Sequence, residues 1–125
     1  MRTWVRSPLD ARETAGGDHA PARSGGEASS ASDDWKNWVL ANVNDHVVRI
    51  GVMSRDFHWH RHSNSDEVLL PLEGSLIVDF EDQSMTLDVG QFVVVPQNVL
   101  HRTRPAGDRV VTLCFEHKDS SITGE

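Results

Sequence analysis

From residue 46 onward, apolar residues alternate with polar ones or form short runs, and turn-forming residues separate these runs. A period of two is typical of strands that bury one face, and the runs recur at intervals of about 8–12 residues. Because no long helical pattern intervenes, the spacing predicts an all-β sandwich or barrel rather than an α/β sheet. The predicted strands are His46–Val52, Phe57–His62, Glu67–Leu72, Leu76–Phe80, Met85–Leu87, Phe92–Val95 and Arg109–Phe115.

The segment before the first of these strands has a different pattern. Trp35, Trp38 and Val39 follow the i, i+3, i+4 spacing of one helix face, and either of the two preceding aspartates could cap such a helix. We therefore expect Asp34–Asn42 to form a short helical or irregular lead-in to the domain.

The first 34 residues have the composition of a disordered extension. Gly, Ala and Ser supply 15 of these 34 positions, and the large apolar residues are few. Such a segment cannot bury enough apolar surface to offset the entropy of ordering it. It also lacks the central apolar run of a signal peptide. We predict an extension over residues 1–34 and one domain over residues 35–125.

Composition then narrows the class of protein. The 19 acidic and 12 basic residues give a net charge of −7, whereas a nucleic-acid surface needs clustered basic residues. No apolar run approaches the ~20 residues that span a bilayer. The single cysteine, Cys114, cannot form an internal disulfide, and its apolar surroundings predict a buried small hydrophobe. We therefore expect a cytoplasmic protein that binds neither nucleic acid nor membrane.

Histidines at alternate positions of one predicted strand are the main candidate for chemistry. Because side chains alternate across a strand, His58, His60 and His62 project from one face. Glu67 follows a Ser-Asn-Ser turn that could bring its carboxylate beside the rings, and His101 follows a later strand and turn. Imidazoles with one carboxylate could hold a metal ion with open coordination positions. Alternating histidines alone, however, more often form a polar surface.

The spacing of these residues resembles that of the cupins, beginning with the first cupin motif. His60-Arg61-His62 is followed by four residues, Glu67, six residues and Gly74, as in that motif. The leading glycine, Gly51, is displaced slightly from its usual place.

The second cupin motif is matched by Gly90, Pro96 and His101 at their usual spacing. Asn98 stands where the family has a glycine, and Pro105 stands where it has an asparagine. Because Asn tolerates a left-handed backbone better than most residues, the turn is still expected to form. The asparagine that Pro105 replaces is not a metal ligand in the family.

The resemblance is closest to the small single-domain bacterial cupins that are similar to mannose-6-phosphate isomerase. It implies a double-stranded β-helix, or jelly-roll barrel, that holds one small-molecule ligand, and it implies a homodimer. It also implies one divalent transition metal, Fe, Mn, Ni, Zn or Cu, with His60, His62, Glu67 and His101 as the metal ligands. By resemblance and strand alternation, the barrel interior is expected to contain Leu69, Pro71, Leu87, Val93 and Val95.

The fold alone does not determine a reaction. We expect a metal-binding cupin that acts on a small polar metabolite, with isomerase-type or dioxygenase-type chemistry. The alternative is a cupin that binds or senses a small molecule without catalysis. His58 departs from the family pattern: it is either a catalytic acid/base or an extra ligand beside the metal, or else a polar residue at the barrel mouth.

Overall fold

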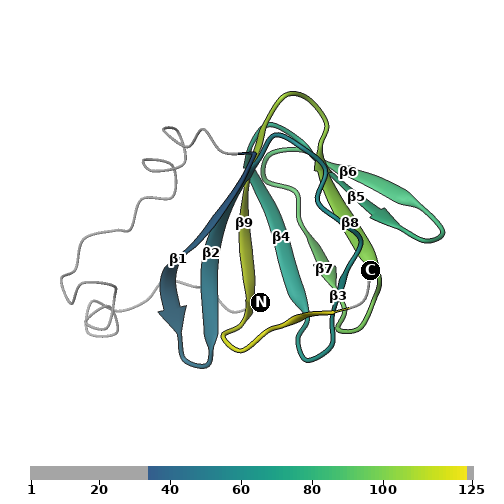
Figure 1. Cartoon of the computed structure of the whole chain (residues 1–125). Coiled ribbons are helices and arrows are strands. Elements are labelled where there is room, and N and C mark those ends of the chain that lie inside the picture. Colours follow the sequence, from purple (N-terminus) through teal and green to yellow (C-terminus); the bar gives the residue numbers. More distant parts are fainter. Residues whose placement is uncertain (1–33, 124–125) are drawn as a thin grey trace, which may run out of the picture.

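The computed structural model describes residues 34–123, and all regular secondary structure in that span is β-strand (Figure 1). Within the span, no helix is long and apolar enough to cross a membrane. The predicted extension, residues 1–34, lies outside the described residues except for Asp34. The strands are β1 (Trp35–Val43), β2 (His46–Met53), β3 (Arg61–His62), β4 (Glu67–Glu73), β5 (Leu76–Phe80), β6 (Ser84–Leu87), β7 (Val93–Val95), β8 (His101–Pro105), β9 (Val110–His117) and β10 (Ile122–Thr123).

The strands form three antiparallel sheets that enclose the interior. The largest has the order β1-β2-β9-β4-β7, the second has the order β6-β5-β8, and β10 pairs with β3. In Figure 1, β7 forms the edge of the large sheet that faces β3 and the β6-β5-β8 sheet. The predicted all-β fold, a jelly-roll barrel, is therefore confirmed.

The main apolar core lies between the two larger sheets. Strand alternation directs one side chain in two from each sheet towards this space. The buried cluster is made of Leu69, Leu76, Val78, Leu87, Val95, Val110 and Cys114. Of the interior residues expected from the sequence, Leu69, Pro71, Leu87 and Val95 are buried, and Val93 is half-buried against the cluster.

The expected lead-in is wrong in its secondary structure, because these residues form strand β1. β1 pairs with β2 along its length, from Trp35 opposite Met53 to Val43 opposite His46. A helix-like spacing over only five residues favours a helix weakly, and the backbone hydrogen bonds to the edge of the sheet stabilise the strand more. Trp38 also packs against a second apolar cluster on the other side of this sheet.

The turns explain several residues of the two motifs. Gly74 and Gly90 have positive φ angles of 75° and 89°, and Asn98 adopts the left-handed conformation with a φ of 69°. The expectation that Asn98 can replace a glycine is thus confirmed. Pro71 lies in a central strand, where a register shift between Pro71 and Glu73 accommodates it as a bulge.

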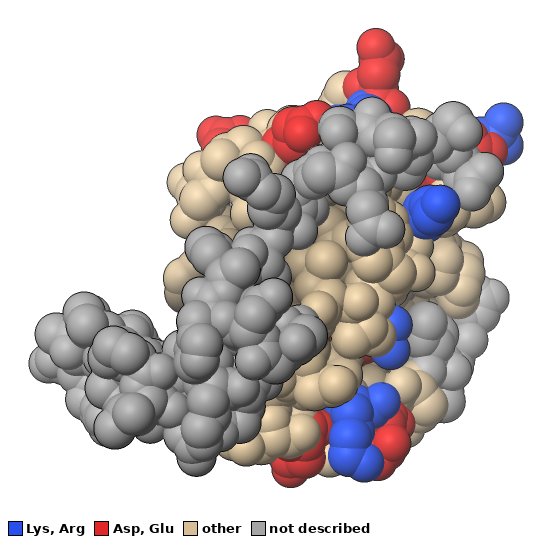
Figure 2. Space-filling model, turned by 90° about the vertical axis from the view of Figure 1, so that its left-hand side faces the viewer, with Lys and Arg blue, Asp and Glu red and all other residues tan. Residues whose placement is uncertain are grey.

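Charge is unevenly distributed on the side of the molecule that carries β1. Viewed from that side, charged side chains lie mainly at the upper and lower margins, and uncharged residues occupy much of the visible described surface between them (Figure 2). Exposed apolar side chains of β1 include Trp35, Val39 and Val43, which are each 44–46% exposed.

Candidate metal centre

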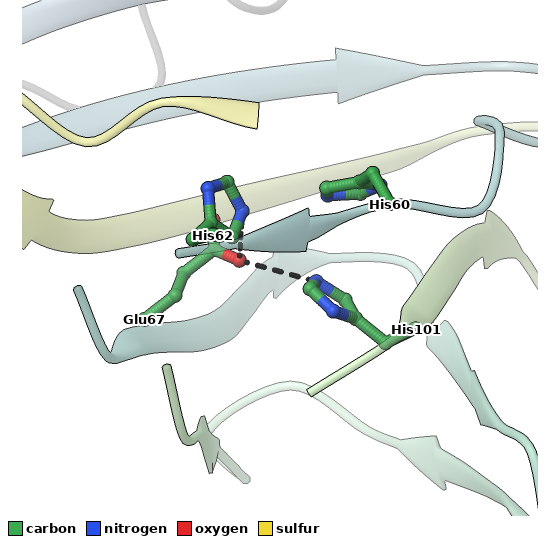
Figure 3. Close-up of side chains that lie close together, drawn as sticks. All are labelled: His60, His62, Glu67 and His101. Carbon is green, nitrogen blue, oxygen red and sulfur yellow. Dashed lines mark ion pairs between the residues drawn. The ribbon is translucent and has the colours of Figure 1, made fainter. Parts of the chain in front are cut away.

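Four of the five candidate residues lie together at one end of the barrel interior (Figure 3). His60 immediately precedes β3 and bridges to β8, His62 ends β3, and Glu67 and His101 are the first residues of β4 and β8. All four are buried, and their potential ligand atoms lie within 4.8 Å of one another. Strand ends that are remote in sequence thus bring together the residues selected by the motif spacing.

The backbone sets which nitrogen of two rings can bind a cation. Nδ1 of His60 lies 2.9 Å from the carbonyl of His58, and Nδ1 of His101 lies 2.9 Å from the carbonyl of Val99. A carbonyl oxygen only accepts hydrogen bonds, so each Nδ1 carries the proton. In the neutral rings, Nε2 then keeps a free lone pair, which is the form that coordinates a metal.

The Glu67 carboxylate lies beside ring nitrogens of two histidines, so several atoms that can donate a lone pair to a metal face one another. Oε1 of Glu67 lies 3.2 Å from Nε2 of His62 and 3.5 Å from Nε2 of His101. Neither of these buried Nε2 atoms has a hydrogen-bond partner among the described residues. Ligands about 2.0–2.2 Å from one ion lie at most about 4.4 Å apart, which is close to the observed spread. The donor set therefore fits a transition-metal ion.

Burial and charge act on the pKa values of three of these groups. Burial, aided by the neighbouring histidines, lowers the pKa of His60 to about 4, so this ring is neutral at pH 7. Burial alone would raise the pKa of Glu67, but His101 and His62 outweigh it and lower that pKa to about 2. Burial likewise opposes a charge on His62, yet the Glu67 carboxylate raises the pKa of His62. The centre thus combines an ionised carboxylate with a neutral imidazole.

His58 is not a member of this cluster, although its ring lies edge-on to that of His60 with the ring centres 5.4 Å apart. The predicted strand Phe57–His62 is regular only at its end, since β3 contains two residues. The backbone N–H of Phe57 donates to the carbonyl of Thr103, and that of His60 donates to the carbonyl of His101. The interval of three residues from Phe57 to His60 therefore pairs with an interval of only two residues in the segment opposite. This extra residue interrupts the expected alternation, and the His58 side chain is exposed, with Nδ1 donating to the Trp59 carbonyl at 3.0 Å.

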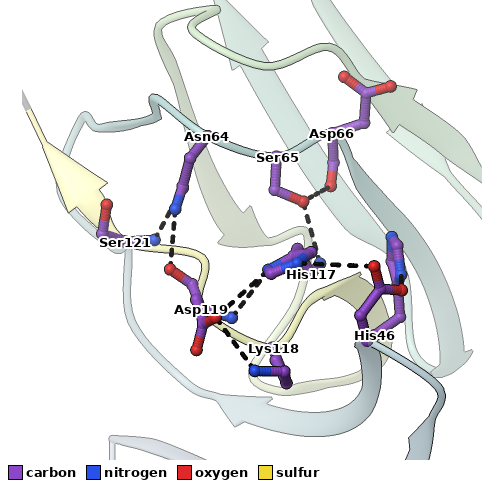
Figure 4. Close-up of polar contacts among 9 residues, drawn as sticks. His46, Asn64, Ser65, Asp66, His117, Lys118, Asp119 and Ser121 are labelled. Carbon is purple, nitrogen blue, oxygen red and sulfur yellow. Dashed lines mark hydrogen bonds and ion pairs between the residues drawn. The ribbon is translucent and has the colours of Figure 1, made fainter.

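The C-terminal segment holds His62 from the side opposite the cluster. β10 pairs with β3, and Ser120 Oγ lies 3.1 Å from Nδ1 of His62, where it can accept the ring proton. Further contacts, with Asn64 donating to the carbonyl of Asp119, secure the segment (Figure 4). Sequence reasoning missed Ser120, because the segment lies outside both motifs.

A cavity of about 390 Å³ opens beside the cluster, and His60, His62 and Glu67 line it. Arg49, Thr112 and Glu116, from β2 and β9, line it as well. The sequence carried one signal for this polar wall: Arg49 occupies an inward position in a strand that is otherwise rich in Val and Ile. That signal was missed.

Two other buried groups contribute to the electrostatics of the cavity. Glu116 lies opposite Glu67 in the β4–β9 register, and burial together with the Glu67 charge raises the pKa of Glu116. Burial also raises the pKa of the Cys114 thiol well above its ordinary value. Cys114 is therefore a thiol packed in the core, as expected from the sequence.

Comparisons with known proteins agree with this architecture. The family model described as a cupin domain (Cupin_2) matches residues 46–115. An uncharacterised Bacillus subtilis protein, YdbB, is 37% identical over 94 residues, which are 74% of this chain and 82% of that protein.

Solved structures show the same similarity. A cupin-2 domain containing protein from Shewanella frigidimarina has 29% identity and a TM-score of 0.69, over 74% of this chain and 89% of that one. A Ralstonia eutropha protein, provisionally named a mannose-6-phosphate isomerase, has 15% identity and a TM-score of 0.66, over 78% and 97% of the two chains. At that identity the likeness concerns the fold alone.

Proposed function

The chain belongs to the cupin domain family, and on that premise we propose that it is a metal-binding cupin acting on a small polar metabolite. The observation that carries the proposal is the convergence of three buried imidazoles and one buried carboxylate beside a cavity. The reaction type proposed is that of an isomerase or a dioxygenase.

The proposed ligands of the metal are His60, His62, Glu67 and His101. Three imidazole nitrogens and one carboxylate oxygen suit Fe, Mn, Ni, Zn or Cu, and they leave coordination positions for a substrate. A bound ion would supply Lewis-acid polarisation of a substrate oxygen, or dioxygen activation if the ion is iron. The chain itself orients the rings through the carbonyls of His58 and Val99 and keeps bulk water from the buried ligand atoms.

Elemental analysis tests the metal centre directly. Untagged protein incubated with each of the five metals and then desalted is expected to retain about one ion per chain for at least one of them. Protein that remains metal-free after all five incubations would refute the proposed centre.

Replacing His58 with alanine tests whether this residue belongs to the metal centre. Because the side chain is exposed and donates to its neighbour's carbonyl, we expect the His58→Ala variant to keep the wild-type metal content. Metal content by elemental analysis provides the measurement. A loss of more than half of the bound metal would instead make His58 part of the centre.

A non-enzymatic function is the second candidate, favoured by the polar wall and cavity, which suffice to bind a ligand without chemistry. Turnover of sugar or dioxygen-dependent substrates by the metal-loaded protein supports the enzyme. Binding of a small molecule that persists after chelation and without turnover supports the binding protein. The expected cytoplasmic location stays a prediction.

We also propose a homodimer formed through the outer face of the large sheet. Val94, Val68, Phe115 and Val48 are aligned across four strands by the register, and all are at least partly exposed. Such a row would be covered by the same face of a second copy. Light scattering after gel filtration is expected to give about twice the chain mass of 13.9 kDa, and a concentration-independent monomer would contradict the proposal.

A further inference from the structure

The cavity has a second polar wall that the metal centre does not use. It is formed by Arg49 of β2 and by Thr112 and Glu116 of β9, which we call the Arg49 wall. Arg49 lies opposite Cys114, so Thr112 and Glu116 are its diagonal neighbours on the same face of the sheet. The wall is therefore a fixed part of the barrel and does not depend on a loop.

Polar atoms of this wall are buried without hydrogen-bond partners. Oγ1 of Thr112 and Oε1 of Glu116 lack a hydrogen-bond partner among the residues the structure describes, and the contact of Nε of Arg49 there is its ion pair with Oε2 of Glu116. Thr112 is only 6% exposed and Glu116 only 7% exposed. Buried polar groups are normally hydrogen-bonded, so two unmatched oxygen atoms on one wall indicate that a polar molecule completes the site.

The existing contacts of Arg49 position its guanidinium group without using all of it. Nε lies 3.3 Å from Oε2 of Glu116, and Nη1 donates to Oδ1 of Asn37 at 3.3 Å. Within the described part of the chain, these contacts leave Nη2 available as a donor. Guanidinium groups bind carboxylates through paired N–H donors, so this geometry favours an anionic group as the partner.

Charge in the cavity favours the same class of ligand. Glu67 and Glu116 are two carboxylates, and Arg49 is one cation beside them. A divalent ion at the proposed metal centre reverses the balance of this set from one net negative charge to one net positive charge. A small monoanion then neutralises the site, whereas a neutral molecule does not.

We propose that the Arg49 wall recognises the carboxylate of a small hydroxy acid, whose hydroxyl lies between Glu116 and Thr112. The Glu116 oxygen accepts a hydrogen bond from that hydroxyl, and the Thr112 hydroxyl can donate to it or accept from it. The remainder of the molecule faces the metal centre, because Glu116 lies next to Glu67 in the register. This inference rests on the proposed function for its charge balance, which includes the metal, whereas the unmatched polar atoms of the wall do not depend on a metal.

Matched pairs of acids and alcohols test the proposal. Glycolate and ethylene glycol, lactate and propane-1,2-diol, and gluconate and sorbitol differ only by a carboxylate in place of a hydroxymethyl group. Calorimetric titration of the metal-loaded protein is expected to show that at least one acid binds about tenfold or more tightly than its alcohol. Equal binding within every pair, or no binding of any acid, would overturn the proposal.

Variants then assign the selectivity to the wall. Arg49→Gln is expected to weaken binding of the preferred acid about tenfold or more, with metal content unchanged. Because this variant leaves Glu116 without its cation, the double variant Arg49→Gln/Glu116→Gln keeps the test valid if the single variant does not fold. Wild-type acid selectivity in a folded variant of either kind would overturn the proposal.

Lys36 provides the matched control. It is also a cation beside the cavity, but its Nζ lies 5.9 Å from the ring centre of Trp38, on the other face of the sheet. Lys36→Gln is therefore expected to change acid affinity less than about threefold, and a loss as large as that of Arg49→Gln would overturn the assignment to Arg49.

The metal content of every sample separates this inference from the proposed function. Stoichiometric metal without acid selectivity refutes the Arg49 wall and leaves the metal centre intact. Arg49-dependent acid selectivity in a chain that binds no metal supports the wall and refutes the metal centre.

Discussion

Replacing His101 with alanine is expected to abolish stoichiometric metal binding and to weaken metal affinity by at least about 100-fold, more than the loss of a group that merely supports a ligand. His101 is fully buried, and its Nε2 has no hydrogen-bond partner among the described residues. The variant removes one of three nitrogens from the centre. Elemental analysis after desalting and a competition titration with a chelator provide the two measurements.

Two further variants show whether the loss is specific. Glu67→Gln keeps the size of the side chain but removes the anionic ligand, so we expect weaker metal binding in a protein that is still folded. His46→Ala removes a half-buried histidine that stacks on Phe115 and lies outside the cluster. It should retain the wild-type metal content. Wild-type metal affinity in folded His101→Ala protein would contradict the assignment of His101.

The four proposed ligands could be predicted because their spacing reflects local geometry. His60 and His62 are two positions apart along nearly extended chain, and Glu67 follows one turn later. His101 was placed by its distance from Gly90 and Pro96 in the second motif. The convergence of the four residues depends on how the strands pair. The family resemblance predicts that pairing, whereas the spacing of the residues alone does not.

The Arg49 wall could not be predicted from spacing. Arg49 and Glu116 are 67 positions apart in the chain, and only the β2–β9 register brings them to the same face. The same limit explains the incorrect lead-in, since β1 is stabilised by pairing with β2 rather than by a pattern within Asp34–Asn42. The position of His58 depends on an extra residue relative to β8, which alternation cannot reveal.

Replacing Gly74 with alanine is expected to destabilise the fold by about 3 kcal/mol, through two separate causes. Its φ of +75° places an L-residue in the left-handed region, which costs roughly 1–2 kcal/mol. An added Cβ would also lie 2.5 Å from the carbonyl oxygen of Arg109. Because that oxygen belongs to the backbone directly before β9, relief requires moving a strand, at a cost of about 1–3 kcal/mol.

Two other glycines separate these causes by denaturant unfolding. Gly90 has a φ of +89°, and its added Cβ would meet no described atom within 4 Å, so Gly90→Ala should cost only the roughly 1–2 kcal/mol of backbone strain. Gly107 has equally open surroundings and no positive φ, so Gly107→Ala should lie within about 0.5 kcal/mol of wild type. Equal losses for Gly74→Ala and Gly90→Ala would show that the contact with Arg109 is easily relieved.

The same variant tests why the first motif contains this glycine. Gly74 directly follows β4, which carries Glu67, and begins the turn to β5. Its close approach to Arg109 fixes the end of β4 against β9. If its role is confined to the backbone, folded Gly74→Ala protein will bind metal with the wild-type stoichiometry despite its lower stability. Loss of metal from the folded variant would instead mean that the turn sets the position of Glu67 at the far end of the strand.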